Sequence, residues 1–142
     1  MAETFQLDPA FEATSVALGS LGLCEARLQN DARWPWIVLI PRSPNAREIE
    51  DLHPLNRARL IDEIVLAGEA VRAIGGALDL AVDKLNVGAL GNVTPQLHLH
   101  VVGRRVGDPA WPGPVWGQGE AAPFSADQLS AAISAAKSAF HL

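Results

Sequence analysis

Apolar residues recur every three to four positions in three parts of the chain, which is the spacing of an amphipathic helix. This pattern predicts helices over residues 8–20, 55–74 and 125–140. The second helix is expected to end at Gly75-Gly76, because glycine favours the C-terminal end of a helix. A capping box that starts at Ser125 is expected to open the last helix.

A second pattern consists of alternating polar and apolar residues and of short apolar runs. It predicts strands over residues 22–29, 36–40, 79–87 and 96–103. Turn-forming residues at Asn30-Asp31 are expected to join the first two strands into a hairpin. Strands that pair mostly as hairpins, with helices between and around them, indicate an α+β fold built on an antiparallel sheet.

Composition narrows the class of protein. The chain has 142 residues, of which 49% are hydrophobic and 19% charged, with a formal net charge of -5. This length suits one domain over residues 1–142. The acidic balance argues against a nucleic-acid partner, because such binding needs a basic surface. It leaves room for one small nucleotide in a polar pocket.

Cellular location follows from what the sequence contains. Cys24 is the single cysteine, so no disulfide can form within the chain. No leader pattern and no apolar run of about 18 residues is present, so no membrane partner is expected. We therefore expect a soluble, cytoplasmic protein.

The candidate chemistry lies in the last predicted strand. Alternate side chains of a strand share a face, so Gln96, His98 and His100 are expected to face one way and the apolar residues between them the core. A glycine-bearing loop over residues 88–92 precedes this strand. Glycines there let backbone N–H groups approach a phosphate closely.

Three interpretations of this histidine pair stay open at this point. The pair belongs to a solvated face of the sheet, or it binds a metal, or it carries out nucleophilic catalysis. Zinc normally takes three or four protein ligands, and His53, His141 and Cys24 are all far away in sequence. A neutral imidazole can attack phosphorus, while its neighbour donates a hydrogen bond to a phosphate oxygen.

The segment from Gly91 to Val102 resembles the signature of the histidine-triad (HIT) family, which alternates three histidines with apolar residues. Residues 30–42 resemble the ribose-binding turn and following strand of that family, and residues 84–88 the strand and loop before the triad. Order and spacing agree from about residue 23 to 104. The resemblance implies an antiparallel sheet of about five strands, with a long helix and a C-terminal helix.

The resemblance also implies roles for the three polar residues. His98 matches the middle histidine, which is the family's nucleophile, and His100 matches the last, which contacts phosphate oxygens. Gln96 stands at the first position, where a histidine is expected. A glutamine there keeps a hydrogen-bond donor but cannot transfer a proton. Its backbone carbonyl could still orient Nδ1–H of His98, as the main chain does in the family.

Six further residues match nucleotide-binding positions or suit a nucleotide chemically. They are Asn30, Asp31, Asn86, Gly91, Asn92 and Arg104. Two other positions depart from the family's pattern. Val93 stands where a hydroxyl residue is common, and Trp36 near a position often held by another histidine.

We therefore expect a nucleotide hydrolase or nucleotidyl transferase that acts at an α-phosphate through a nucleotidyl-histidine. The implied substrates are dinucleoside polyphosphates or nucleoside phosphoramidates, and the implied assembly is a homodimer. No metal site and no cofactor are required, although magnesium could accompany a polyphosphate. The alternatives are a nucleotide-binding protein with little or no turnover and a metal-binding sheet.

Overall fold

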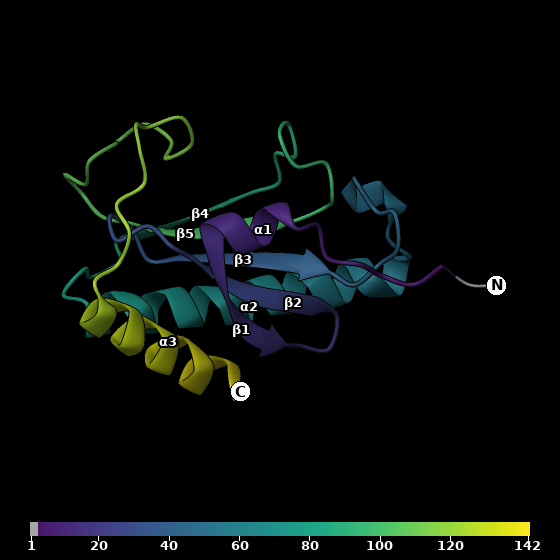
Figure 1. Cartoon of the computed structure of the whole chain (residues 1–142), viewed down its shortest axis with the longest axis horizontal. Coiled ribbons are helices and arrows are strands. Elements are labelled where there is room, and N and C mark those ends of the chain that lie inside the picture. Colours follow the sequence, from purple (N-terminus) through teal and green to yellow (C-terminus); the bar gives the residue numbers. More distant parts are fainter. Residues whose placement is uncertain (1–2) are drawn as a thin grey trace.

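The apolar run that begins at Trp36 forms the most buried strand of the molecule. The computed structural model describes residues 3–142, and within them five antiparallel strands form one sheet (Figure 1). The strands are β1 (Ser15–Ser20), β2 (Cys24–Gln29), β3 (Trp36–Pro41), β4 (Lys84–Gly88) and β5 (Leu99–Arg104). Their order is β1-β2-β3-β5-β4, which confirms the α+β fold with about five antiparallel strands.

The register of the sheet places the histidine segment on an internal strand, next to the edge strand β4. β2 and β3 pair as the predicted hairpin, with Leu28 opposite Ile37. β5 lies between β3 and β4, with His100 opposite Val38 of β3 on one side and Gly88 of β4 on the other. His100 therefore sits on a strand that is held along both edges.

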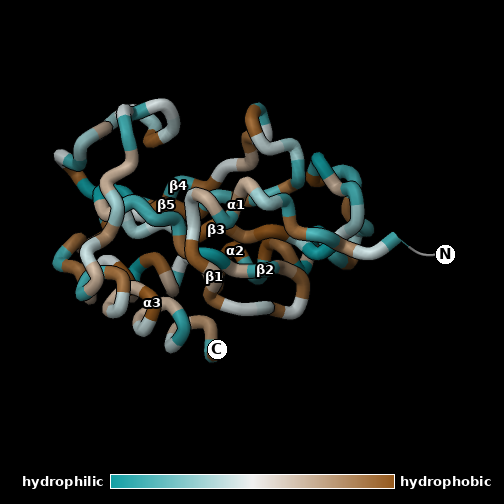
Figure 2. Tube along the Cα trace, viewed as in Figure 1, coloured by the Kyte–Doolittle hydropathy of each residue, from teal (hydrophilic) through white to brown (hydrophobic). Residues whose placement is uncertain are grey.

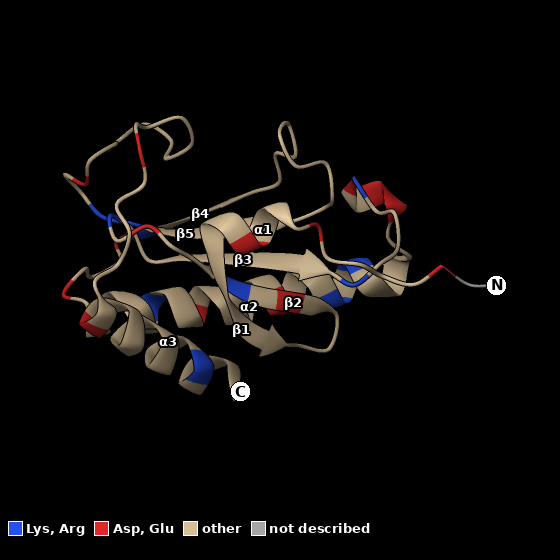
Figure 3. Ribbon diagram, in the orientation of Figure 1, with Lys and Arg blue, Asp and Glu red and all other residues tan. Residues whose placement is uncertain are grey.

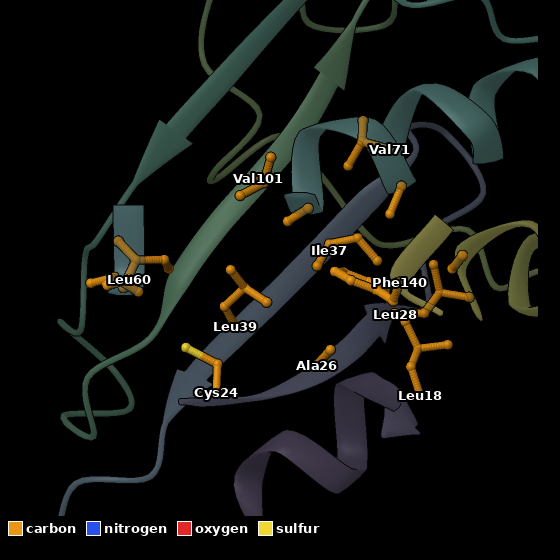
Figure 4. Close-up of a cluster of buried hydrophobic side chains, with 14 of the residues drawn as sticks. Leu18, Cys24, Ala26, Leu28, Ile37, Leu39, Leu60, Val71, Val101 and Phe140 are labelled. Atoms are coloured by element: carbon orange, nitrogen blue, oxygen red, sulfur yellow. The ribbon is translucent and has the colours of Figure 1, made fainter. Parts of the chain in front are cut away.

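Two helices cover one face of the sheet. They are α2 (Pro54–Ala77), whose Pro54 suits a first helical turn, and α3 (Ala126–Phe140). At Ser125 the predicted capping box is present and opens α3. Side chains from both helices and from the sheet form the larger core, where Figure 4 shows Val71 and Phe140 facing Ile37 and Val101. Figure 2 shows the hydrophobic middle of β3, of which Ile37 and Leu39 belong to this core.

The other face of the sheet carries a smaller core beneath the short helix α1 (Ala10–Thr14) and irregular segments. Phe11 of α1 packs there with Trp34, Trp36 and Val38. Phe5 and Leu7 of the N-terminal segment add to this cluster. The histidine face of β5 therefore lies under α1 rather than against α2.

The predicted first helix over residues 8–20 is wrong beyond Thr14, because the chain continues as strand β1. A bulge between Ala17 and Gly19 interrupts the pairing of β1 with β2. It leaves Ser15 and Leu18 buried, three positions apart, as in a helix. Phe11 is buried as well, so the buried residues of this region follow one another at helical spacing although most of it is a strand.

The predicted end of the long helix is also wrong, because α2 passes through Gly75-Gly76 and ends at Ala77. Gly75 serves close packing instead. Leu80 N donates a hydrogen bond to Gly75 O, which brings the following segment back against the helix. A Cβ on Gly75 would lie 2.5 Å from the carbonyl oxygen of Leu80.

Three predicted strands begin later than the sequence indicated. The strand predicted over residues 22–29 begins as β2 at Cys24. Residues 79–83 do not belong to β4, which starts at Lys84, and residues 96–98 do not belong to β5, which starts at Leu99. Leu97 N donates to Ala46 O outside the ladder of β5. Gln96 and His98 therefore lie in the segment that leads into the strand.

A separate finding concerns membranes. Within residues 3–142, none of the helices combines the length and the apolar character needed to cross a membrane.

Gly75 and Gly76 provide a matched pair for testing the close contact at the end of α2. Gly75→Ala should lower the free energy of unfolding by about 1–3 kcal/mol, because its methyl group would overlap the backbone of Leu80. Gly76→Ala should raise it by up to about 1 kcal/mol, because nothing lies within 4 Å and alanine favours a helix. Urea denaturation measures both values, and equal effects would contradict this account.

Candidate functional site

His98 lies just before β5 and His100 within it, and their rings face each other, with ring centroids 4.8 Å apart and planes at 75°. The side chains of Leu97, Leu99 and Val101 point into the larger core, as predicted. Anchored on that side, the segment presents both imidazoles to the opposite face. His98 is only 7% exposed, so its ring is largely enclosed.

A backbone contact fixes the tautomer of His98. Nδ1 of His98 lies 2.7 Å from the carbonyl oxygen of Gln96. A carbonyl can only accept a hydrogen bond, so Nδ1 carries the proton and Nε2 of the neutral ring keeps a free electron pair. This contact confirms the predicted orientation of His98 by the main chain.

A different contact gives His100 the opposite tautomer. Nε1–H of Trp36 donates a hydrogen bond of 3.0 Å to Nδ1 of His100. The indole can only donate, so the proton of the neutral His100 ring lies on Nε2. Burial, and to a smaller extent the nearby His98, lowers the pKa of His100 from its ordinary 6.5 to about 4. His100 is therefore a neutral donor at neutral pH.

Both histidines line a cavity of about 560 Å³. This volume lies in the range of small-molecule sites. Residues of α1, of β2 and β3, of the loop after β4 and of the segment between β5 and α3 complete the wall. The lining consists of Ala10, Phe11, Ala13, Thr14, Gln29, Val38, Leu90, Gly91, Asn92, Val93, Thr94, His98, His100 and Trp116. The walls are largely apolar, with a few polar groups, as suits a ligand that has a flat ring and a polar end.

No Lys, Arg, Asp or Glu side chain is among the residues that line this cavity. Figure 3 shows the whole stretch from β4 through the loop into β5 without a charged residue between Lys84 and Arg104. A bound anion would meet N–H and O–H donors there rather than cations.

The model of the HIT domain family matches residues 10–107, which is more than half of the chain. The chain belongs to the HIT family. The family consists of nucleotide-binding hydrolases and transferases, so the chain has a fold used for that chemistry. Among curated proteins, none matches the chain.

Solved structures of other HIT proteins are similar over almost the whole chain. One, a histidine triad protein from Sinorhizobium meliloti, is 41% identical, with a TM-score of 0.87, over 95% of this chain and 96% of that one. A second, from Bradyrhizobium japonicum, is 37% identical with a TM-score of 0.89, over 97% and 99% of the two chains. A third, from Marinobacter aquaeolei, is 39% identical with a TM-score of 0.89, over 98% of each chain.

Gln96 departs from its predicted place on a common face with the two histidines. Its side chain turns away from their cavity: Oε1 accepts a hydrogen bond from Asp8 N, and Nε2 donates one to Gln6 O. The alternation of a strand does not apply to Gln96, because β5 begins three residues later. Only its backbone carbonyl reaches a histidine.

The turn that resembles the family's ribose site uses its side chains internally. Asp31 is buried and forms an ion pair of 2.8 Å with Arg33. Oδ1 of Asn30 accepts a hydrogen bond from Phe124 N. Neither Asn30 nor Asp31 lines the cavity. Their role towards a ribose stays a prediction.

Arg104, predicted to bind phosphate, is 2% exposed and faces inward. Its Nε and Nη2 donate to the two carboxylate oxygens of Asp108 at 2.8 and 3.0 Å, and Nη1 donates to Oδ1 of Asn86. Burial acts to raise the pKa of Asp108, but hydrogen bonds from Arg104 and from backbone N–H groups outweigh it and hold that pKa well below its ordinary value. Arg104, Asn86 and Asp108 thus form a polar cluster, and none of the three lines the cavity.

The glycine-bearing loop does reach the site. Gly91, with a positive φ of 73°, and Asn92 both line the cavity. Val93 lines it too and is 94% exposed, which places this loop at the mouth. Thr94 beside it also lines the cavity and carries a hydroxyl group at the position next to the one where the family often has it.

The metal-binding alternative finds no cluster of ligands. Within residues 3–142, no group of three or more His, Cys, Asp and Glu side chains is placed to hold a metal ion. Cys24 lies in the larger core, where burial, and after it the neighbouring Glu63, raises the pKa of its thiol.

Three aromatic residues belong to the site in addition to the predicted ones. Phe11 meets the His98 ring edge-on at 4.9 Å, Trp36 donates to His100, and Trp116 lies 5.5 Å from His100 between ring centroids. The alternation of β3 could have placed Trp36 on the face of His100. Phe11 and Trp116 carry no such signal, because they reach the site from a short helix and from the irregular segment between β5 and α3.

The low pKa of His100 predicts an effect of pH on stability. Above pH 6.5 the ring is neutral whether the chain is folded or unfolded. Between pH 6.5 and 4 the unfolded chain binds the proton and the folded chain does not, so the free energy of unfolding falls as pH decreases, by about 3 kcal/mol. Urea denaturation at pH 7 and at pH 4.5 measures the fall.

Other groups also titrate in this range, so a variant isolates His100. His100→Gln keeps an acceptor for the Trp36 N–H but cannot titrate. The fall between the two pH values should be smaller in this variant by most of that contribution. An identical fall in wild type and variant would show that His100 does not resist protonation in the folded protein.

Proposed function

We propose that this protein is a nucleotide hydrolase in which His98 attacks the α-phosphate of a bound nucleotide. The single observation that carries the proposal is the pair of opposite tautomers. Nε2 of His98 has a free electron pair, and Nε2 of His100 has a proton to donate. A nucleophile and a donor beside it are what attack at a phosphate requires.

The reaction divides into two balanced steps. In the first, the electron pair on Nε2 of His98 forms a bond to phosphorus while the bond from phosphorus to the leaving group breaks. The leaving group keeps that bonding pair and takes a proton from water. The phosphorylated ring then carries a positive charge, and the Gln96 carbonyl stabilises it through Nδ1–H.

In the second step, a water molecule attacks phosphorus and the phosphorus–nitrogen bond breaks. The electron pair returns to Nε2 of His98, and the nucleoside monophosphate leaves with the water's hydroxyl group. The remaining proton of that water passes to solvent, where it neutralises the hydroxide formed when the leaving group was protonated. His100 donates to a phosphate oxygen in both steps and keeps its own proton. Asn92 and Thr94 at the mouth supply further donors of hydrogen bonds.

The charge of the cavity bears on the class of substrate. A dinucleoside polyphosphate brings several negative charges, and no cationic side chain lines the cavity to offset them. A nucleoside phosphoramidate has one phosphate group, which N–H donors can satisfy. We therefore favour phosphoramidates over polyphosphates, which would need magnesium to accompany them. The flat apolar wall at Phe11 and Val38 suits a base such as adenine.

A nucleotide-binding protein without turnover is the alternative function. It would use the same cavity, and the glutamine at position 96 and the valine at 93 favour it because both remove groups that the family's pattern supplies. A chemical trap for the covalent intermediate separates the two functions. A cytoplasmic location stays a prediction.

We also propose that two copies of the chain associate through β4. β4 pairs only with β5, so its other edge is free within residues 3–142. Val87 on β4 is 48% exposed, and Ile61 and Val65 of α2 are exposed as well. Leu85 of β4 lies against Gly68 of α2, so this edge and that helix are neighbours.

His98→Ala should abolish turnover and labelling of the protein. Incubation with a panel of adenosine phosphoramidates and polyphosphates labelled at the α-phosphate, with and without magnesium, tests this. Wild type should retain label after an acid-free quench, and His98→Ala should retain none, because the nucleophile is missing. His53→Ala serves as the control, because His53 caps α2 away from the cavity.

The outcome separates the two functions. Nucleotide binding without labelling or turnover in wild type, on any member of the panel, would favour the binding protein. Label that persists in His98→Ala would place the nucleophile elsewhere.

Association through β4 predicts a dimer in sedimentation equilibrium. Val87→Lys should convert it to a monomer, because a charge on the strand edge opposes pairing with another strand. Val106→Lys, at an exposed position beyond β5, should leave the dimer intact. A wild-type monomer, or a dimer unchanged by Val87→Lys, would exclude this interface.

A further inference from the structure

The side chain of Gln96 imitates a backbone peptide group. Its Oε1 accepts a hydrogen bond of 2.9 Å from Asp8 N, and its Nε2 donates one of 2.8 Å to Gln6 O. These two backbone groups lie on either side of Leu7. They point to the same side of the N-terminal segment, where a neighbouring strand would form the same two hydrogen bonds. The carboxamide thus binds the N-terminal segment at two points, across 88 and 90 positions of sequence.

The bound segment leads directly into the wall of the cavity. Oδ1 of Asp8 accepts a hydrogen bond from Ala10 N, and its carbonyl oxygen accepts one from Phe11 N, so Asp8 holds the first turn of α1. Phe11 then packs edge-on against the His98 ring at 4.9 Å. Figure 1 shows the N-terminal segment running past the end of β3 before it turns into α1.

Gln96 therefore acts on His98 from two directions. Its carbonyl oxygen holds Nδ1 of the ring. Its side chain holds Asp8, Asp8 holds the start of α1, and α1 carries the Phe11 ring against the imidazole. One residue thus contacts the ring directly at Nδ1 and supports it indirectly through Phe11.

We infer that Gln96 is a positioning residue, whose carboxamide docks residues 6–8 and thereby places Phe11 against His98 and closes that wall of the nucleotide cavity. A direct role at phosphorus does not fit its contacts. Both polar atoms of the carboxamide are bonded to the N-terminal segment, and Gln96 does not line the cavity of His98. It lines a separate polar hollow with Gln6 and Asp8 instead.

Amide hydrogen exchange tests the docking without reference to activity. The Asp8 N–H should be protected in the wild type and should exchange at least about tenfold faster in Gln96→Ala, because its acceptor is removed. Gln96→Glu keeps the shape and the acceptor but sets an oxygen against Gln6 O, so exchange should also rise. Val38 N–H in β3 should keep its protection in both variants, which shows that the sheet remains folded.

Gln6→Ala is the matched control. It changes a side chain of the same segment and leaves the Gln6 carbonyl that Gln96 binds. Exchange of Asp8 N–H should stay at the wild-type rate in this variant. Unchanged exchange in Gln96→Ala, or a rise in Gln6→Ala as large as that in Gln96→Ala, would overturn the proposal.

Kinetics test the consequence for the cavity, and this arm rests on the proposed function. Loss of the wall should raise KM for an adenosine substrate by about tenfold, which corresponds to 1.4 kcal/mol, with a smaller change in kcat. Phe11→Ala should have a similar effect, and the double variant should be little worse than either single variant, because both remove the same wall.

The possible results separate the two proposals. A fall in kcat at constant KM in Gln96→Ala, or effects that add fully in the double variant, would show that the glutamine acts at phosphorus and would overturn the positioning role. Faster exchange of Asp8 N–H in Gln96→Ala, with no turnover in the wild type, would support the docking role and count against the proposed function alone.

Discussion

The site depends on two hydrogen bonds to Nδ1 atoms that run in opposite directions. Gln96 accepts from His98, and Trp36 donates to His100. Two neighbouring neutral imidazoles without these contacts would exchange tautomers freely, and each would be a nucleophile part of the time. Because a carbonyl can only accept and an indole N–H can only donate, each ring is left with one role at Nε2.

Two of the three departures from the HIT pattern make sense in these terms. Trp36 stands near a position where another histidine is common, and here its N–H sets the tautomer of His100. Gln96 lacks an ionisable side chain, but its main chain still orients His98. The site keeps two imidazoles of fixed and opposite polarity, and the tryptophan and the glutamine hold them in place.

Periodicity predicted the parts of the fold that are buried on regular faces. β3, β2, the body of α2 and the capped start of α3 follow from local patterns, since each buries residues at the spacing of its own element. β1 could not be predicted, because its bulge interrupts the alternation. Ser15 and Leu18 are both buried although they are three positions apart, which is a helical spacing. The inward-facing Arg104 was also missed, because its partner Asp108 becomes visible only when the chain turns back after β5.

The candidate site could be predicted where its residues follow the alternating pattern of a strand. Alternation correctly set the histidines apart from Leu97, Leu99 and Val101, and the resemblance to the HIT family singled out His98. Alternation failed at Gln96, because this residue lies before the hydrogen-bonded pairing of β5 begins. The use of its carboxamide depends on residues 6–8, about ninety positions away, and no local pattern records a contact of that range.

A cavity without formal charge places a particular demand on the residues around it. A phosphate that entered it would lose water and would gain only N–H and O–H dipoles. The field of a dipole falls off faster with distance than the field of a cation. Such donors are effective only if they are already aimed at the anion before it arrives. The packing of Phe11, Trp36 and Trp116 around the two imidazoles meets this demand, because it removes the freedom of the rings to turn. The aromatic wall is therefore part of the electrostatics of the site, since it fixes the direction of the dipoles that a phosphate would meet.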